Sequence, residues 1–451
     1  APPDGGVGGA GGNGGDEGSG GTAGAGGSGG SGATGGDPLE GEWQPPEIIE
    51  AHEGSGLNPR VAIGATGEAM AVWVQSFLGE HRVWANRYDA ASGWEGDASI
   101  GTTDGNLMDP TITSQPDVVV DDDGVATATW GDFTDPILRG VVARRYESLG
   151  GWGTAEAIYD GSSTAGDARM AVDGSGKVTA VFPVTSNVWA SHFEPGDGWT
   201  APAIIDGDPG TPTGVQIALE SDGDGWAVWS QAPTGIPRNI YGNQLASGAW
   251  GAADEIETAS TGFGLEPRLA LGSNGDALFI WKRENVGVSH VWTNHWDASA
   301  GELSEPIRLD DAVTAYAPDI AMSPSGVGVA VWLQSAVLSS GELDVAASRY
   351  TPGSGWSEPE TLTTGDVRDE PRVAMDAGGN AIVVYAEKVE YEDYTDAWAQ
   401  IYTEGSWGSP VRLGLDEWTA PAFQPSIAMA PNGNAVVVWR EGPDIWAATF
   451  E

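Results

Sequence analysis

Apolar and polar positions repeat along this chain with a period of roughly 50 residues. Each copy opens on a short apolar segment, follows it with a Gly-containing turn, and continues into a second apolar segment that ends on an aromatic residue. Segments this short, rich in β-branched residues and separated by Gly turns, predict antiparallel strands. The eight opening segments begin at Pro59, Pro116, Ala168, Val215, Pro267, Pro318, Pro371 and Pro425.

Aromatic residues mark the remaining strands of each copy. The second segment ends on Trp73, Trp130, Phe182, Trp229, Trp281, Trp332, Tyr385 and Trp439. A third, alternating segment also carries aromatics, and a fourth usually opens on Trp, as at Trp94 and Trp152. Four short strands per copy and eight copies predict an all-β fold, an eight-bladed β-propeller of four-stranded antiparallel blades. We expect most of these aromatics to pack between blades.

The last copy is incomplete, because the chain ends at Glu451 before a fourth segment. The missing segment occurs near the other end, at Gly41–Ile49, which contains Trp43. This arrangement predicts a ring closed by an N-terminal strand that completes the C-terminal blade. We therefore assign residues 40–451 to the propeller.

Residues 1–39 are almost purely small and polar, with Gly predominating. Such a tract buries no apolar surface, so we expect a disordered, Gly-rich linker. It is similar to the spacers of bacterial lipoproteins, which implies a lipid anchor upstream of residue 1; the alternative is a plain secreted linker. Either way we expect a secreted or outer-surface bacterial protein, tethered by this linker.

Charge and composition narrow the functional classes. The net charge of −46 repels phosphate backbones, so we expect no nucleic-acid partner. No apolar run approaches the roughly 20 residues of a membrane helix, and the chain has no cysteine, which excludes disulfides and thiol chemistry. We expect a monomer.

The most specific polar pattern occurs at the start of the first strand, where the innermost strand of each blade would meet the channel mouth. Arg occupies this position in every odd blade, although the chain has only 19 basic residues. The full set is Arg60, Asp117, Arg169, Gln216, Arg268, Asp319, Arg372 and Ser426. One interpretation is a ring of ion pairs that closes the mouth, since Arg pairs bidentately with carboxylates. The other is an axial binding site for an anion or a sugar acid.

Longer connections lie on the face where the chain enters the first strands. They include residues 74–82, 131–139, 386–395 and the segment around Trp418. Variable loops on a rigid scaffold tend to carry binding residues. We expect this loop-rich face to bind the ligand, with Trp418 as a candidate contact for a sugar or a partner protein.

Other motifs are weaker. Glu220, Asp222 and Asp224 resemble a calcium loop, but they also form the expected turn between strands one and two. We therefore expect no cofactor, with calcium as the alternative. Residues such as Glu266, Asp319 and Glu370 are candidates for the paired carboxylates of glycoside hydrolysis.

Segments such as Tyr88–Trp94 resemble a degenerate Asp-box, Ser-x-Asp-x-Gly-x-Thr-Trp, without its leading Ser. The repeat is thus similar to sialidase-like propellers and bacterial lectin-type propellers. That resemblance implies a carbohydrate ligand, whereas Pro-Arg-Val replaces the Phe/Tyr-Arg-Ile-Pro motif of sialidases. Our leading hypothesis is a non-catalytic binding propeller for a glycan or protein ligand. A polysaccharide-acting glycosidase or lyase and a structural or adhesive cell-envelope component are the alternatives.

Overall fold

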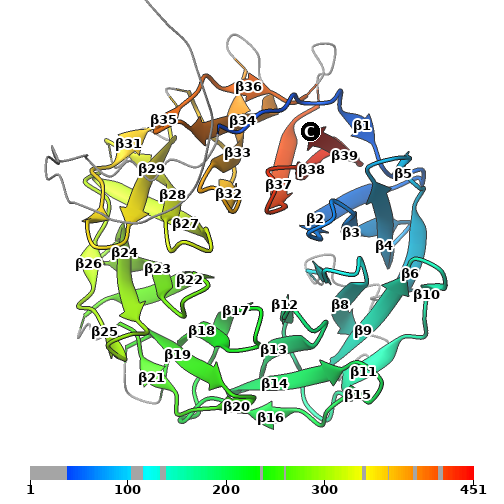
Figure 1. Ribbon diagram of the computed structural model, residues 1–451, viewed down its shortest axis with the longest axis horizontal. Helices are drawn as coiled ribbons and strands as arrows, with labels where there is room; N and C mark the ends of the chain where they lie inside the picture. Colours follow the sequence, from blue (N-terminus) through cyan, green and yellow to red (C-terminus); the bar gives the residue numbers. More distant parts are fainter. Residues whose placement is uncertain are drawn as a thin grey trace, which may run out of the picture. The chain divides into compact units, whose positions relative to one another are not determined.

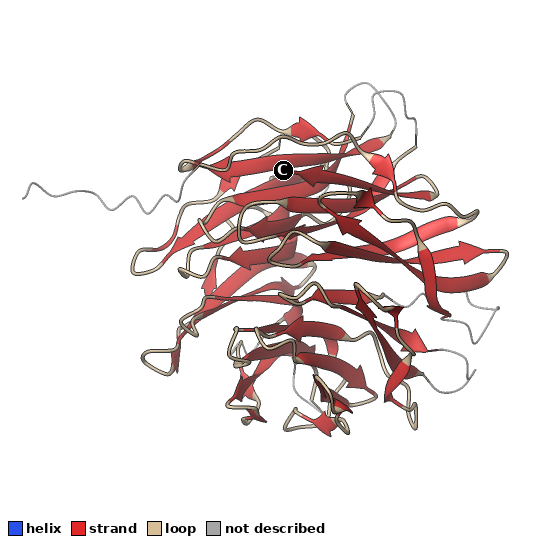
Figure 2. Ribbon diagram, turned by 45° about the vertical axis from the view of Figure 1, so that its right-hand side comes forward, coloured by secondary structure: helices blue, strands red, loops and turns tan. Residues whose placement is uncertain are grey.

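The computed structural model confirms an eight-bladed β-propeller. It describes residues 38–102, 115–132, 139–233, 237–257, 261–337, 342–363, 365–389, 394–414 and 420–451, all within one unit, residues 35–451. Eight antiparallel sheets surround a central axis (Figure 1). The described part contains strands and loops and no helix (Figure 2), and therefore no helix that could cross a membrane.

The three inner strands of each blade follow the order of the sequence. The first strands lie nearest the axis (Figure 1) and are β2 (Ser55–Ile63), β7 (Asp117–Val120), β12 (Arg169–Val172), β17 (Thr213–Leu219), β22 (Phe263–Leu271), β27 (Thr314–Met322), β32 (Arg372–Met375) and β37 (Ala422–Met429). The second strands are β3 (Ala69–Phe77), β8 (Ala126–Asp132), β13 (Val178–Val184), β18 (Gly225–Gln231), β23 (Ala277–Asn285), β28 (Gly328–Ser335), β33 (Ala381–Lys388) and β38 (Ala435–Glu441). The third strands are β4 (Glu80–Asp89), β9 (Gly140–Glu147), β14 (Asn187–Glu194), β19 (Asn239–Ala246), β24 (Val288–Asp297), β29 (Asp344–Thr351), β34 (Thr395–Thr403) and β39 (Asp444–Phe450).

The fourth strand is divided in seven blades into two short segments that pair with the same third strand. The segments are β5 (Gly93–Trp94) and β6 (Ala98–Thr102); β10 (Gly151–Trp152) and β11 (Glu156–Tyr159); β15 (Gly198–Trp199) and β16 (Ala203–Ile204); β20 (Ala249–Trp250) and β21 (Asp254–Glu255); β25 (Glu302–Leu303) and β26 (Ile307–Arg308); β30 (Gly355–Trp356) and β31 (Glu360–Thr361); β35 (Ser406–Trp407) and β36 (Val411–Arg412). The predicted Trp, replaced by Leu303 in blade five, is the second residue of the first segment, and the chain then leaves the sheet and returns.

The predicted ring closure is confirmed. In the eighth blade, β1 (Glu47–Ile48) pairs with β39, although the two lie at opposite ends of the chain. Backbone amides of Glu42, Gln44 and Ile49 donate to carbonyls of β39 and Glu451 at 2.8–2.9 Å. Trp43 packs edge-on against Phe450, with ring centroids 5.3 Å apart. Leu39, which we assigned to the linker, also contacts the seventh blade, since its amide donates to Thr403 Oγ1 at the end of β34 at 3.0 Å.

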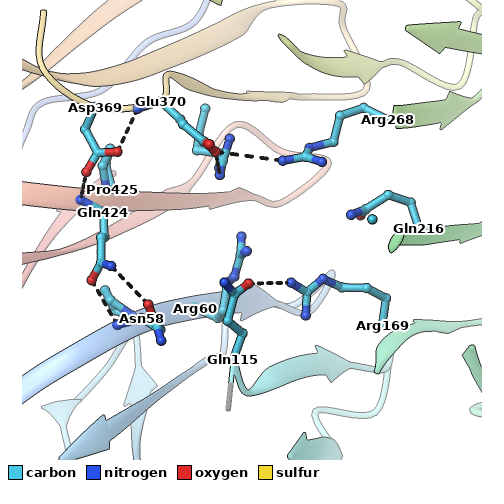
Figure 3. A pocket seen from close by; sticks show the side chains of 13 residues that line it. Asn58, Arg60, Gln115, Arg169, Gln216, Arg268, Asp369, Glu370, Gln424 and Pro425 are labelled. Atoms are coloured by element: carbon cyan, nitrogen blue, oxygen red, sulfur yellow. Dashed lines mark hydrogen bonds and ion pairs between the residues drawn. The ribbon is translucent and has the colours of Figure 1, made fainter. Parts of the chain in front are cut away.

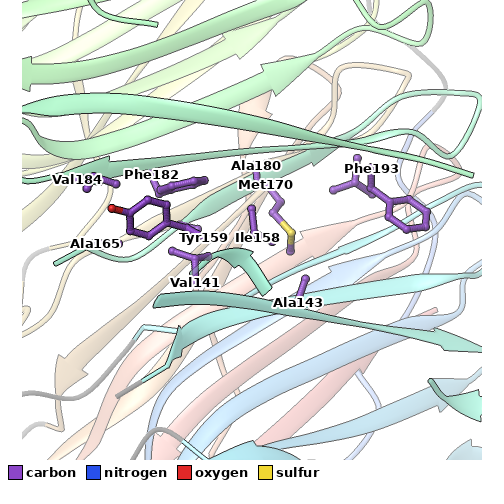
Figure 4. Packing of buried hydrophobic residues seen from close by; sticks show 12 residues of the cluster. Val141, Ala143, Ile158, Tyr159, Ala165, Met170, Ala180, Phe182, Val184 and Phe193 are labelled. Carbon is purple, nitrogen blue, oxygen red and sulfur yellow. The ribbon is translucent and has the colours of Figure 1, made fainter. Parts of the chain in front are cut away.

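Apolar clusters between neighbouring blades form the core. The aromatic residues predicted to end the second strands lie within them, and seven of the eight are among the largest fully buried side chains, Trp130 being 3% exposed. Figure 4 shows one cluster, in which Val141 and Ile158 of blade two meet Met170 and Phe182 of blade three. Each blade thus stabilises its neighbours, and ring closure extends this packing to the first and last blades.

Carboxylates buried beside these aromatics make stability depend on pH. Burial raises the pKa of Glu257 and that of Glu441 to about 7, although indole N–H groups of Trp281 and Trp439 act in the opposite direction. Glu257 is 1% and Glu441 3% exposed. Between the ordinary Glu pKa of 4.5 and about 7 the folded protein binds more protons than the unfolded chain. The stability that these groups contribute is complete below pH 4.5 and is lost as pH rises towards 7.

We therefore expect the double variant Glu257→Gln, Glu441→Gln to be more stable than the unchanged protein at pH 8, by about 2–4 kcal/mol, and to differ little from it at pH 5. Urea unfolding midpoints at both pH values measure this difference. An equal stability difference at pH 5 and pH 8 would contradict the raised pKa values of Glu257 and Glu441.

Candidate functional site

In four blades a β-bulge lies directly before the first-strand residue that faces the axis. In β2, β22, β27 and β37 the register with the second strand shifts by one residue, which is a β-bulge. The bulge holds a residue with positive φ directly before proline, for example Asn58 at 52° and Gln424 at 56°. These strained positions occur in blades one, five, six and eight, and Asn58 and Gln424 line the larger axial cavity.

The structure brings six predicted site residues together around the axis. Together with Gln216 and Ser426 they line a cavity of about 250 Å³. The six are Arg60, Asp117, Arg169, Arg268, Asp319 and Arg372. A second cavity of about 330 Å³ adjoins it towards the loop-rich face and shares its four arginines and Gln216. We call Arg60, Arg169, Gln216, Arg268 and Arg372 the axial basic site; Figure 3 shows this site, with Gln216 opposite Arg60. The remaining predicted residue, Trp418, lies outside the described residues.

The two aspartates of the ring link neighbouring blades. Asp117 Oδ2 accepts a hydrogen bond from the backbone amide of Met170 at 2.8 Å, and Asp319 Oδ2 accepts one from Val373 at 3.0 Å. Burial raises the pKa of Asp117, against the opposing effect of Arg169 and Arg60. These contacts support the closure interpretation for the acidic members of the ring.

Two of the four arginines of the ring form ion pairs with carboxylates. Arg372 Nη2 lies 2.6 Å from Glu370 Oε2, and Arg268 Nε lies 3.5 Å from Asp319 Oδ1. Burial lowers the pKa of Arg372, but Asp319 and Glu370 outweigh that effect and the pKa is raised. Burial alone would raise the pKa of Glu370, but Arg372 and Arg268 lower it.

The other two arginines, Arg60 and Arg169, form no ion pair with a carboxylate of the described residues. Arg169 donates to the Gln115 amide oxygen at 2.9 Å and to the Ala168 carbonyl at 3.0 Å (Figure 3). Within the described residues the Arg60 guanidinium has neither a hydrogen bond nor an ion pair, and the Gln216 side chain has no hydrogen bond. Burial, followed by repulsion from Arg169 and Arg372, lowers the pKa of Arg60 to about 9. Arg60 therefore stays charged at neutral pH with donors directed into a cavity.

Several cavity residues were missed by the sequence analysis. Asp369 accepts from the amides of Glu370 at 2.8 Å and Gln424 at 2.5 Å. Asn58 and Gln424 pair across the ring closure, with both hydrogen bonds at 3.0 Å (Figure 3). These residues stand one or two positions before the Pro-Arg or Pro-Ser motif. That position in the repeat was the signal that could have identified them as cavity residues.

The calcium candidate has other partners. Asp222 Oδ1 accepts from the Asp224 amide at 3.0 Å, and Asp224 Oδ1 accepts from the Ser247 amide at 2.6 Å. Burial and then the two neighbouring aspartates raise the pKa of Glu220. Across the described ranges, no cluster of three or more His, Cys, Asp or Glu has a metal-binding arrangement.

The candidate carboxylates for hydrolysis are engaged in ion pairs. Glu266 pairs with Lys282 and accepts from the Ala317 amide at 3.2 Å. Glu370 pairs with Arg372, which keeps it ionised. A general acid needs a proton near neutral pH, and the lowered pKa of Glu370 does not favour one.

Comparison with known proteins supports the fold. No protein-family model matches the chain, and no curated protein matches it. Among solved structures, the polysaccharide lyase Uly1 is 11% identical with a TM-score of 0.50, over 77% of this chain and 91% of the lyase. A protein of unknown function from Dyadobacter fermentans is 12% identical (TM-score 0.46; 91% and 99% covered), and a mutant of the sialidase NanB from Streptococcus pneumoniae is 8% identical (TM-score 0.40; 91% and 99%). At these identities the likeness concerns the fold, so the chain is a β-propeller with polysaccharide lyases and a sialidase among its structural neighbours.

Proposed function

We propose that the protein is a non-catalytic binding propeller that takes an acidic glycan into the axial basic site. The observation that carries the proposal is Arg60, a charged guanidinium in a cavity, with no hydrogen bond or ion pair from the described residues. A carboxylate or sulfate would satisfy its fork and relieve its repulsion from Arg169 and Arg372. On this proposal the protein acts outside the cell or at its surface, as a monomer.

The charge distribution favours one anionic group over a polyanion. The chain carries a net charge of −46, so an extended polyanion across its surface would be repelled. Four arginines at one place oppose this field locally. A single acidic unit entering the mouth therefore fits better than a chain of charged units.

A sugar acid fits the remaining groups better than a protein side chain. The Gln216 amide lines the same cavity as Arg60 and Arg169 and offers both a donor and an acceptor, which suits the hydroxyl groups of a sugar acid. The larger cavity, about 330 Å³, is at the lower end of the range for small-molecule sites. It suits one or two sugar units.

The catalytic alternative has less support. The candidate carboxylates Glu266 and Glu370 are ion-paired with Lys282 and Arg372. Turnover of an acidic polysaccharide that is lost on changing Glu370 to Gln would favour a lyase or hydrolase instead.

The proposal is tested with acidic oligosaccharides and their methyl-esterified counterparts. We expect calorimetry to detect binding of the acids and at least about 30-fold weaker binding of the esters, because esterification removes the charge that Arg60 would pair with. In Arg60→Met the affinity for the acid should fall by about 100-fold or more. Arg144→Met is the matched control, since it removes one positive charge from β9, where Arg144 contacts backbone carbonyls. Equal loss in both variants, or none in Arg60→Met, would contradict the proposal.

A further inference from the structure

A cavity of about 340 Å³, separate from the two axial cavities, lies on blade one. It is formed on the β3–β4 hairpin, whose two-residue turn has φ values of 52° at Leu78 and 85° at Gly79. Three cross-strand pairs share one face of this hairpin because they are two residues apart. They are Trp73 with Trp84, Gln75 with Arg82, and Phe77 with Glu80.

The inner part of this face packs against blade eight, while the outer part is open. Trp73 is fully buried in a cluster with Val438 and Ile445. Towards the turn, Phe77 is 42% exposed, and the His52 side chain is 45% exposed. The hairpin therefore presents an aromatic surface towards solvent on the loop-rich side.

Hydrogen bonds and stacking fix the floor of the cavity. Gln75 accepts from Trp73 Nε1 at 3.1 Å and donates to the His52 carbonyl at 3.3 Å. The His52 ring lies on Trp84 with centroids 3.9 Å apart, and its Nε2 is 3.4 Å from Asp97 Oδ2. A floor held in this way is preorganised for a ligand.

The rim is polar and carries no excess positive charge. Arg82 Nη2 pairs with Glu80 Oε2 at 3.0 Å, both groups being about half exposed, and Glu53 also lines the cavity. A carboxylate and a guanidinium side by side can bind adjacent hydroxyls, while aromatic faces contact C–H groups. A pyranose ring has both kinds of surface, and an anionic sugar would meet two acids against one base.

Blade five has the same hairpin without the open surface. Its corresponding pairs are Trp281 with Trp292, Arg283 with His290, and Asn285 with Val288. Arg283 occupies the position of Gln75, and its guanidinium lies 5.1 Å from the centroid of the Trp292 ring and donates to the Thr261 carbonyl. Blade five thus places an arginine on Trp292, whereas blade one places the His52 ring on Trp84 and leaves Phe77 exposed beside it.

We propose that the cavity formed by His52, Gln75, Phe77, Glu80, Arg82 and Trp84 is a subsite for an uncharged pyranose unit. It deepens the proposed function, because it lies on the same blade and towards the same face as Arg60. A glycan with an acidic end at the axis and neutral units over blade one would use both sites. The two sites remain separable, because one needs a charge and the other does not.

The test measures binding of a panel of neutral oligosaccharides by saturation-transfer NMR and calorimetry. We expect the unchanged protein to bind at least one of them, and Phe77→Ala and Arg82→Ala each to weaken that binding by about 10-fold or more. Both side chains are exposed, so the fold should persist. Phe263→Ala is the control, because Phe263 is a 53% exposed phenylalanine at the start of β22 in blade five.

The outcomes separate the two proposals. Arg60→Met should leave neutral binding unchanged, and Phe77→Ala should leave binding of an isolated sugar acid unchanged. The subsite is overturned if the panel shows no neutral ligand, or if Phe77→Ala and Phe263→Ala have the same effect.

Discussion

Replacing Arg60 by methionine is expected to stabilise the ligand-free protein, by about 1–3 kcal/mol. The guanidinium lies in a cavity with no hydrogen-bonding partner among the described residues, and repulsion from Arg169 and from Arg372 each exceeds the attraction of Asp117. A methionine of similar length removes both the desolvation cost and the repulsion, and such replacements of buried charges can stabilise a protein. A binding residue that costs stability in the free protein is typical of functional sites.

The same substitution at Arg372 should destabilise the protein. Arg372 lies 2.6 Å from Glu370, and its pKa is raised by Asp319 and Glu370. Arg372→Met leaves Glu370 without its main partner, so we expect a loss of about 2–4 kcal/mol. Urea unfolding of both variants measures the contrast. Destabilisation of similar size in both would mean that the ring serves closure alone.

Loss of the closing strand is expected to be the most damaging change to the fold. A chain starting at Glu50 lacks the hydrogen bonds from Glu42, Gln44 and Ile49, and it exposes the edge of β39. It also loses the packing of Trp43 and of Ile49, which is 3% exposed. We expect at least about 4 kcal/mol of destabilisation and a tendency to aggregate. A chain starting at Pro38 keeps all these contacts and should be as stable as the chain of residues 1–451.

Two adjacent residues provide a finer test of closure. Ile49 points into the cluster between blades eight and one, whereas Ile48 is 42% exposed. We expect Ile49→Ala to cost about 2–4 kcal/mol and Ile48→Ala less than about 0.5 kcal/mol, measured by thermal or urea unfolding. Equal costs would contradict the assigned register of β1.

The fold was predictable because its signals repeat. An aromatic residue at the end of strand two, as at Trp73 or Trp439, recurs once per blade, and the copy broken between Trp43 and Glu451 indicated ring closure. The split fourth strand was not predictable, since Gly93–Trp94 gives no sign that the chain leaves the sheet before Ala98. Residues 74–82, expected as a long loop, extend β3 and β4 to a two-residue turn.

Prediction of the site was limited by contacts between blades. Recurrence of Arg at one position identified the axial ring, because four arginines are conspicuous among 19 basic residues. It could not distinguish Arg60 from Arg372, because the contact of Arg372 with Glu370 is visible only in the structure. The blade-one cavity had a weak signal in the repeated Trp-x-Gln of Trp73 to Gln75 and Trp229 to Gln231, which closes an indole hydrogen bond. The Trp418 contact and the linker over residues 1–39 stay predictions.

The central claim is that an acidic sugar binds at Arg60. A crystal structure of the protein with the tightest acidic ligand from the calorimetric panel tests it most directly. We predict a carboxylate or sulfate oxygen about 3 Å from the Arg60 guanidinium, within the cavity that Gln216 and Arg169 also line. A bound ligand whose acidic group lies elsewhere, with Arg60 left uncontacted, would contradict it.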